Sequence, residues 1–276
     1  MYWQKVPLEA LRPKYVLNGY PKAGLHLAEL MLAPVVLPQP ADGLFSDHWV
    51  GSFRGHAWTA EWLPTRNICF RLSRLQAGRL VKGHLGHSDE IEQFLYLTGA
   101  AVVFVYRDLR DVAVSQTHHI LNPDDHQFEH PDKTIYQEMT FDEALSAVIE
   151  GLGPYPGVIE RWALYAPWLG CEWVLKMPFE RMREGPELAA QQLLEYGLRR
   201  VSGAIGLEMR LDDAEYARMV ETMVAAAAQR QLSPTYRKGQ VGGWRDVFTE
   251  QHKVLFKAHD GEGWLVQLGY ESDEEW

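Results

Sequence analysis

Short runs of β-branched and aromatic residues alternate with longer amphipathic segments along the first two thirds of the chain. The short runs predict strands near residues 15–18, 79–82, 101–106 and 172–176. The segments between them have helical spacing of apolar residues, as in Asp89 to Leu97 and Asp111 to Ile120. After residue 176 the pattern is helical, over Pro186 to Val201 and Asp212 to Gln229. This order predicts an α/β fold with three layers, a central parallel sheet, helical C-terminal additions, and ligands at the carboxyl ends of the strands.

Two stretches lack a regular pattern. Residues 34–66 are rich in Pro, Gly and Trp, and residues 121–140 are rich in Asp, His and Pro. Long segments of this kind inside compact domains are usually lids or binding loops. Because no Ser/Gly linker or repeat marks a boundary, we expect one domain over residues 1–276, with a flexible, solvated acidic tail at about 271–276.

Two segments have the order strand, loop, helix that is typical of phosphate binding. The first runs from Tyr15 to Gly24 and holds Lys22 in its loop, and the second runs from Val102 to Ser115 and holds Arg107 at its turn. The helix that follows each loop directs free N–H groups and the positive end of its dipole toward an anion. The pair predicts a ligand with phosphates at both ends.

The first loop differs from the Walker pattern. Gly19 and Gly24 have the Walker spacing, but Leu25 and His26 stand where Lys and Ser/Thr belong. With no hydroxyl to bind magnesium, a metal-dependent nucleoside triphosphatase is disfavoured. The loop then suits a phosphate ester bound without metal, or is an ordinary turn with an exposed lysine.

Three segments together resemble the cofactor motifs of the cytosolic-type sulfotransferases. They are Tyr20 to Gly24, Arg107 to Ser115, and Tyr236 to Trp244, in the family's order. Leu80 to Leu85 looks like the family's Lys-x-His-Leu segment, and Leu175 to Pro186 is similar to the strand and turn before its late helices. The resemblance spans residue 15 to about residue 250. It implies 3′-phosphoadenosine 5′-phosphosulfate (PAPS) as cofactor and adenosine 3′,5′-bisphosphate (PAP) as product.

The resemblance implies a role for each matching residue. His84 is the general base, Lys22 stabilises the leaving phosphate, and Lys82 assists on the same strand face, because strand side chains alternate with period two. His87 is the nearest competitor of His84. In the resembling family the positions of Arg107 and Ser115 hold the 3′-phosphate. The implied cofactor-binding residues are Pro21, Lys22, Ala23, Gly24, Leu25, His26, Arg107, Ser115, Arg237, Lys238 and Gly239.

The chain departs from the family at the 5′-phosphate end and beside it. Leu25 and His26 replace hydroxyl residues, so backbone amides and His26 are expected to take their place. Leu27 or Ala28 stands where an aromatic residue stacks on adenine, and Phe179 replaces a tyrosine. Around the second loop, Arg107 to Asp111 alternatively forms a local pair at a helix start, with Arg110 a solvated neighbour and Asp111 suited to the helix dipole.

The acceptor site is the least determined. Trp49, Phe53, His56, Trp58 and Trp62 either wall an apolar pocket or pack a lid. His118 or His119 is placed to reach the acceptor. The spacing of His118, His119, His126 and His130 matches no common zinc site, so we predict no metal.

Composition and charge limit the classes of partner and compartment that we expect. The net charge of −10 disfavours nucleic acid, and the basic residues gather in the proposed loops. Cys69 and Cys171 lack disulfide or metal spacing, which fits a reducing compartment. No run approaches the roughly 18 apolar residues of a membrane span, and the first residues lack a signal pattern. We therefore expect a cytoplasmic protein with no membrane partner, while the resemblance leaves a homodimer open.

We predict a sulfotransferase that moves a sulfuryl group to a hydroxyl or amine of a small molecule, without a metal. Two alternatives remain: a nucleotide-kinase-like phosphotransferase and a non-catalytic PAP-binding protein.

Overall fold

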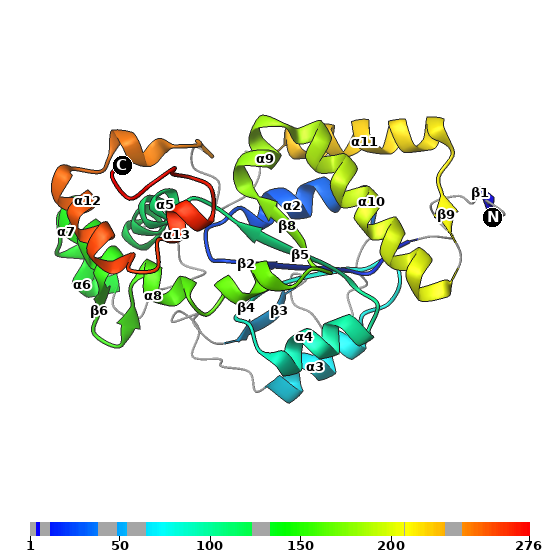
Figure 1. Ribbon diagram of the computed structural model, residues 1–276, viewed down its shortest axis with the longest axis horizontal. Coiled ribbons are helices and arrows are strands. Elements are labelled where there is room, and N and C mark those ends of the chain that lie inside the picture. Colours follow the sequence, from blue (N-terminus) through cyan, green and yellow to red (C-terminus); the bar gives the residue numbers. More distant parts are fainter. Residues whose placement is uncertain are drawn as a thin grey trace.

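The computed structural model describes residues 4–5, 12–37, 49–53, 65–122, 133–206, 208–229 and 239–276. Its centre is a five-stranded sheet in which all strands are parallel (Figure 1). In spatial order the strands are β3 (Trp49–Phe53), β4 (Leu80–Leu85), β2 (Tyr15–Gly19), β5 (Ala101–Tyr106) and β8 (Leu175–Pro178). The predicted α/β fold with a central parallel sheet is confirmed.

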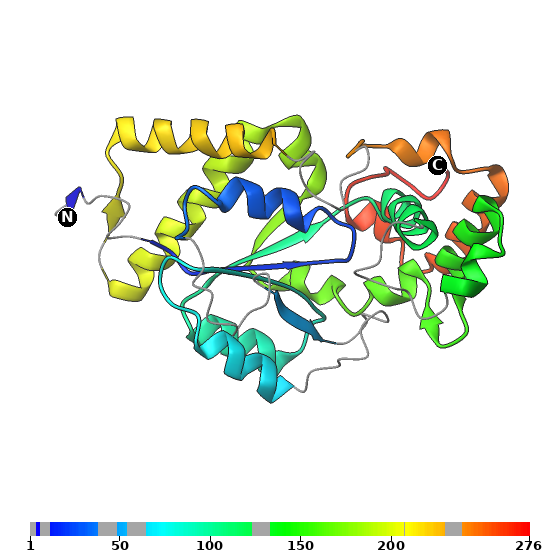
Figure 2. The ribbon, with the colours of Figure 1, turned by 180° about the vertical axis from the view of Figure 1, so that it is seen from behind.

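Helices cover both faces of this sheet (Figures 1 and 2). One face carries α2 (Leu25–Leu32), α9 (Phe179–Glu184), α10 (Pro186–Ile205) and α11 (Asp213–Ala227). The other carries α3 (Thr65–Ser73) and α4 (Asp89–Leu97). The sheet is therefore the middle of three layers.

A second group of helices lies beyond the carboxyl ends of the strands (Figure 1). It contains α5 (Leu109–Leu121), α6 (Lys133–Gln137), α7 (Phe141–Glu150), α8 (Val158–Trp162), α12 (Glu250–His259) and α13 (Trp264–Gln267). Short pieces complete the described chain: the hairpin of β6 (Gly151–Leu152) and β7 (Tyr155–Pro156), the pair β1 (Gln4–Lys5) and β9 (Met209–Arg210), and the 3₁₀ turns η2 (Ala166–Gly170) and η4 (Gly243–Asp246). This group borders the edge of the sheet where ligands are expected.

Local sequence explains the central strands and several helix ends. Every residue of β2 is buried, and so are the first five of β5, as expected for parallel strands covered on both faces. Thr140 and Glu143 form a capping box at the start of α7. Pro186 lies in the first turn of α10, and Gly206 ends that helix in the left-handed region at φ 69°.

Parts of the two stretches predicted to be irregular are regular. Residues 34–66 contain β3, which pairs with β4, and the start of α3. Residues 121–140 contain α6. The prediction failed at β3 because that strand is short, has Gly51 at its centre, and pairs only through its sequence-distant neighbour.

The predicted solvated tail is wrong at its two ends. Glu271 Oε1 accepts a hydrogen bond from Arg110 Nη1 at 2.5 Å. The Trp276 ring lies edge-on to Trp244 at 5.6 Å and to Phe256 at 5.8 Å. Residues 272–275 between them are exposed. Glu271 and Trp276 are therefore packed against the rest of the chain, and the residues between them face solvent.

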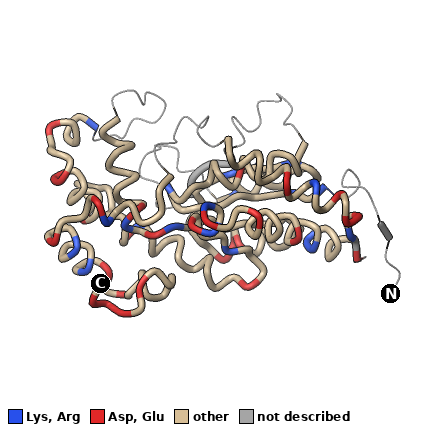
Figure 3. The backbone as a smooth tube through the Cα atoms, turned by 90° about the horizontal axis from the view of Figure 1, so that it is seen from above, with Lys and Arg blue, Asp and Glu red and all other residues tan. Residues whose placement is uncertain are grey.

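Charged residues of both signs are interspersed along the described chain (Figure 3). Within the described ranges, none of the helices combines the length and the apolar composition that crossing a bilayer requires.

Candidate active site

Residues 20–24 form a tight loop between β2 and α2. Lys22 and Gly24 both have left-handed backbone conformations, with φ 66° and φ 94°. A Cβ atom at Gly24 would lie 2.4 Å from Cδ2 of Phe179, so only glycine fits without displacement of that ring. Helix α2 begins at Leu25, and its N-cap residue, Gly24, provides no side-chain cap. Its first N–H groups are therefore available to an anion.

His84 lies at the carboxyl end of β4, against this loop. Its Nδ1 lies 2.6 Å from the backbone oxygen of Gly19. Because a carbonyl oxygen only accepts, Nδ1 carries the hydrogen and the lone pair is on Nε2. Burial lowers the pKa of His84 to about 3, against the opposing effect of the Gly19 hydrogen bond, and the positive charges of His26, Lys22 and Arg161 lower it further. The imidazole is thus neutral at pH 7, with its hydrogen on Nδ1.

Buried side chains hold the end of β4 in place. The Asn18 side-chain amide accepts from Leu85 N at 2.8 Å and donates to Leu85 O at 2.9 Å. Trp168 Nε1 donates to the same oxygen at 2.8 Å, and the Tyr165 hydroxyl donates to His84 O at 3.3 Å. The backbone of His84 is therefore fixed from both β2 and the η2 segment.

Lys82 lies two residues before His84 and contacts the same β2–α2 unit. Its Nζ donates to Glu29 Oε2 at 2.7 Å and lies 3.5 Å from His26 Nδ1, which is itself 3.2 Å from Glu29. Burial raises the pKa of Glu29, but the hydrogen bonds from His26 and Lys82 outweigh it and bring the pKa to about 2. Glu29 is therefore an anion that pairs with the Lys82 ammonium and contacts the His26 ring on α2.

Arg107 lies between β5 and α5 and is 8% exposed. Its Nη2 donates to Gln240 O at 2.7 Å and to Asp111 Oδ2 at 3.3 Å. The guanidinium carbon lies 4.4 Å from the centre of the Phe179 ring. Its buried Nε has no hydrogen-bond partner among the described residues. An orphaned guanidinium N–H suits a phosphate oxygen as acceptor.

Asp111 connects the second phosphate segment to the third. Its carboxylate accepts from Gly242 N at 2.9 Å and from Trp244 N at 2.8 Å. The local pair with Arg107 that the sequence predicts is also present, at 3.3 Å. Asp111 therefore does more than complement the helix dipole, because it fixes residues 239–246 against α5.

Arg110 is predicted from the sequence as a solvated neighbour, and this is wrong. Its side chain is fully buried. It donates to Asp108 through Nε at 3.0 Å and through Nη2 at 2.8 Å. Its guanidinium carbon lies 3.8 Å from the ring centre of Trp244 and 4.4 Å from that of Trp276. The prediction failed because both rings come from the last 33 positions of the 276-residue chain, far from Arg110 in sequence.

Comparison with known proteins identifies the family. The sulfotransferase domain matches residues 12–261. The chain belongs to the sulfotransferase family. Sulfotransferase 6B1 of Mus musculus is 23% identical over 189 residues, which are 65% of this chain and 55% of that relative. The match thus spans about half of that curated relative's length.

Solved structures show the same fold. Mouse sulfotransferase SULT7A1, complexed with PAP, has a TM-score of 0.56 at 15% identity, with 96% of this chain and 92% of that chain covered. Retinol dehydratase, in complex with androsterone and the inactive cofactor PAP, has a TM-score of 0.51 at 17% identity, with 91% and 81% covered. The resemblance to sulfotransferases predicted from the motifs is confirmed at the level of family and fold.

In this sulfotransferase fold the two predicted phosphate segments lie next to each other. Phe179 joins them, because its ring is the nearest group to Gly24 and also lies under Arg107. Ser115 is half-buried in α5, two turns after Arg107. Gly239 begins the segment that Asp111 holds, and its backbone oxygen accepts from Arg183 Nε at 2.7 Å.

The predicted acceptor residues of the sulfotransferase are placed only in part. Trp49 and Phe53 are in β3, opposite Lys82 and Leu85 of β4 in the strand register. His118 and His119 are in the last turn of α5, where the His118 ring lies 4.6 Å from Phe141. The remaining predicted residues lie outside the described residues: Arg237, Lys238, His56, Trp58, Trp62, His126 and His130. Their roles stay predictions.

Three contributors to the site are missing from the predicted set. Asp111 anchors the third motif, Asn18 fixes β4, and Phe179 packs between the phosphate loops. A signal existed for Asn18, because a polar residue within the apolar strand that precedes a phosphate loop needs a buried partner. The sequence marks Phe179 only as the replacement of a tyrosine, because its contacts with the two loops come from the packing of α9.

Proposed function

We propose that this protein transfers a sulfuryl group from PAPS to a hydroxyl or amine of a small-molecule acceptor. The observation that carries the proposal is the hydrogen bond between His84 Nδ1 and Gly19 O, 2.6 Å long. This bond turns Nδ1 toward the end of β2 and keeps the ring at the phosphate loop. The lone pair of the neutral imidazole, on Nε2, is therefore directed away from β2. The solved relatives that hold PAP support the choice of cofactor class.

The residues present fit a ligand with two phosphates. The loop of residues 20–24 and the first N–H groups of α2 suit the 5′-phosphate. Arg107, whose buried Nε lacks a described partner, suits the 3′-phosphate. Ser115, Arg237, Lys238 and the Gly239 amide are assigned to the same phosphate by their motifs. The usual adenine-stacking residue is absent, and Phe179 is the aromatic side chain that lies between the two loops and could take its role.

The chain's own residues then divide the work of the transfer. The bound cofactor supplies the sulfuryl group. His84 Nε2 removes the proton from the acceptor hydroxyl or amine as that atom attacks. Lys22 offsets the negative charge that develops on the leaving phosphate, and Lys82 adds positive charge while Glu29 keeps it in position.

This assignment calls for no metal in the transfer step, since Leu25 and His26 replace the residues that would hold magnesium. We also propose a cytoplasmic location, supported by Cys69 and Cys171, which form no disulfide.

The test is calorimetric titration with PAP, adenosine 5′-monophosphate and ATP, each with and without magnesium. We expect metal-independent binding with preference for PAP. Arg107→Ala should weaken PAP binding by about ten- to a hundredfold, since a charge-assisted hydrogen bond contributes about 1.5–3 kcal/mol. Arg199→Ala is the matched control, because that guanidinium is on the surface of α10 with 67% of its side chain exposed. Magnesium-dependent preference for ATP would refute the proposal.

Activity is tested with a panel of phenols, alcohols and amines and isotopically labelled PAPS. His84→Asn keeps a side-chain N–H near Gly19 O but has no base, so it should bind PAP as the parent does and lose transfer by at least about a hundredfold. If His84→Asn transfers at the parent rate, His84 is not the base.

A further inference from the structure

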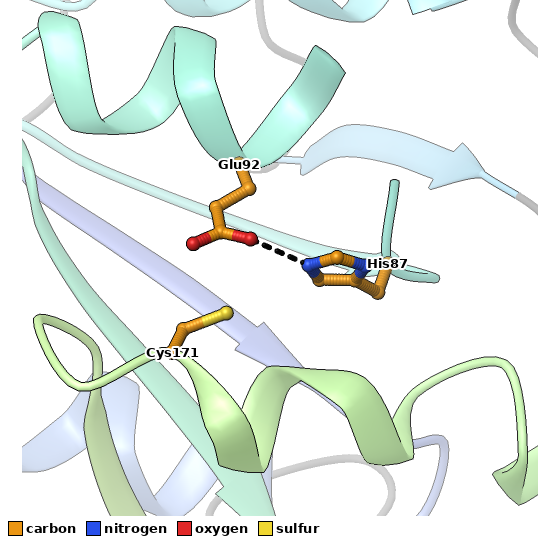
Figure 4. A group of neighbouring side chains, drawn as sticks. All are labelled: His87, Glu92 and Cys171. Carbon is orange, nitrogen blue, oxygen red and sulfur yellow. Dashed lines mark hydrogen bonds and ion pairs between the residues drawn. The ribbon is translucent and has the colours of Figure 1, made fainter. Parts of the chain in front are cut away.

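Three side chains of metal-ligand type meet near the carboxyl end of β4 (Figure 4). His87 follows β4, Glu92 lies in the first turns of α4, and Cys171 follows η2. His87 Nε2 lies 2.7 Å from Glu92 Oε2, and the ligand atoms of all three lie within 4.8 Å of one another. We propose that His87, Glu92 and Cys171 bind a zinc ion, with water in a fourth position. This inference does not rest on the proposed transferase activity.

The spacing of the three atoms is close to what a tetrahedral site needs. Zinc lies about 2.0–2.3 Å from nitrogen, oxygen and sulfur ligands, so ligand atoms around it are about 3.3–3.8 Å apart. The 2.7 Å contact between His87 and Glu92 must therefore open by roughly 1 Å, and the separations of up to 4.8 Å from the third atom must close by a similar amount. Both side chains are half-buried, with 14% and 29% exposed, and can make these adjustments by rotation.

The ligand set matches the charge and softness of zinc. A thiolate, a carboxylate and a neutral imidazole are the ligand types that zinc takes most often. One thiolate and one carboxylate balance a double positive charge, so the partly buried site becomes neutral. A positive charge lies close to the site, because the Lys176 ammonium donates to the backbone oxygen of Cys171.

A reactive thiol is a weaker explanation of the same cluster. Burial, and then the neighbouring Glu92 carboxylate, raise the pKa of the Cys171 thiol to about 12. A thiol that stays protonated at neutral pH is a poor nucleophile. A bound cation would replace that proton.

Neighbouring groups already orient two of the ligands. Trp173 Nε1 donates to Glu92 Oε1 at 3.1 Å, which leaves Oε2 directed at His87. The backbone of His87 donates to Leu164 O at 2.7 Å, and its ring lies edge-on to Trp168 at 5.0 Å. Such outer-shell contacts fix ligand geometry and raise affinity.

A metal here would tie three segments together. The η2 segment holds the end of β4 through Tyr165 and Trp168. Zinc bound to His87 and Cys171 would add a link between the same two segments. Binding to the folded state alone raises thermal stability in proportion to the logarithm of the zinc concentration.

The experiment is titration of the full chain, stripped with chelator, with Co²⁺ as an optical probe and Zn²⁺ as competitor. We expect one equivalent of Co²⁺ to give tetrahedral d–d bands and a near-ultraviolet thiolate-to-cobalt band, both removed by Zn²⁺. Cys171→Ser should lose the thiolate band, whereas Cys69→Ser, which changes the free thiol on α3, should keep it. A thiolate band that survives Cys171→Ser, or none in the parent chain, overturns the proposal.

Two further variants remain informative if Cys171→Ser folds poorly. Glu92→Gln keeps the shape of the side chain and should weaken Co²⁺ binding by at least about tenfold. Trp173→Phe removes the indole N–H that orients Glu92, together with one of the two fused rings, and should weaken binding by about tenfold. It should also halve or abolish the zinc-dependent rise in melting temperature. Unchanged Co²⁺ affinity in both variants would contradict the assignment.

Discussion

Replacement of Asp111 by asparagine tests whether one carboxylate organises the second and third motifs together. Its Oδ2 accepts from Arg107 and from Gly242 N, and its Oδ1 accepts from Trp244 N at 2.8 Å. An amide has only one acceptor oxygen. In its better orientation, the new side chain would keep the two bonds at the Oδ2 position and leave the Trp244 N–H facing a donor.

The magnitude follows from these contacts. A buried N–H without a partner costs about 1–3 kcal/mol, and the two bonds that remain lose their charge assistance. Relief of the buried charge acts the other way, since burial raises the pKa of Asp111 above its ordinary value. We expect a net loss of about 2–4 kcal/mol in the free energy of unfolding, or roughly 4–8 °C in melting temperature at about 2 °C per kcal/mol for a chain of this size. PAP affinity should fall more than about tenfold, because Arg107 and residues 239–246 are both released.

The assays are urea denaturation followed by circular dichroism, and calorimetry with PAP. Asp213→Asn is the matched control, because it changes an exposed aspartate in the first turn of α11. If Asp111→Asn changes neither unfolding free energy nor PAP affinity beyond the change seen in Asp213→Asn, the carboxylate does not hold the two motifs together.

Three other outcomes follow from the structure. The folded-state pKa of His84, about 3, is below its ordinary 6.5. The stability that the neutral imidazole contributes is therefore complete above pH 6.5 and declines toward pH 3, by up to about 1.4 kcal/mol per pH unit. In urea denaturation between pH 7.5 and 4.5, the free energy of unfolding of His84→Asn should depend less on pH than that of the parent. Gly24→Ala should cost about 2–4 kcal/mol and weaken PAP binding, because φ is 94° and the new methyl meets Phe179 at 2.4 Å. Trp276→Ala should cost about 1–2 kcal/mol in urea denaturation, because the buried Arg110 loses one of its two aromatic faces.

Matched variants separate these effects from general damage. Gly153→Ala introduces the same residue at φ 57° with nothing within 4 Å, so it reports backbone strain alone. Glu275→Ala changes an exposed side chain beside Trp276. If Gly24→Ala and Gly153→Ala lower the free energy of unfolding equally, the contact with Phe179 does not explain the effect at Gly24. If Trp276→Ala and Glu275→Ala lower it equally, the Trp276 ring over Arg110 does not stabilise the fold. If the free energy of unfolding of His84→Asn depends on pH as that of the parent does, other groups cause the loss of stability at low pH.

Elements with strong local patterns were predictable. The strand–loop–helix units at residues 15–24 and 102–115 follow from apolar runs and loop residues that lie next to each other in sequence. Lys82 and His84 are predicted on the same face of their strand by its two-residue period, and both contact the β2–α2 unit. Short edge elements were not predictable, because β3 pairs with a strand about 30 positions away and has little pattern of its own.

The sequence by itself determined the fold class, the order of the motifs and the residue types available for phosphate and proton chemistry, since these depend on local periodicity and loop composition. Only the tertiary structure decided which charges are buried and what they contact. Arg110 lies between two rings from the end of the chain, and Asp111 holds backbone N–H groups about 130 positions away. His87, Glu92 and Cys171 share no metal-ligand spacing and meet only through packing. The physical reason is that burial and electrostatic contact depend on distance in space, which sequence spacing does not encode across separate elements.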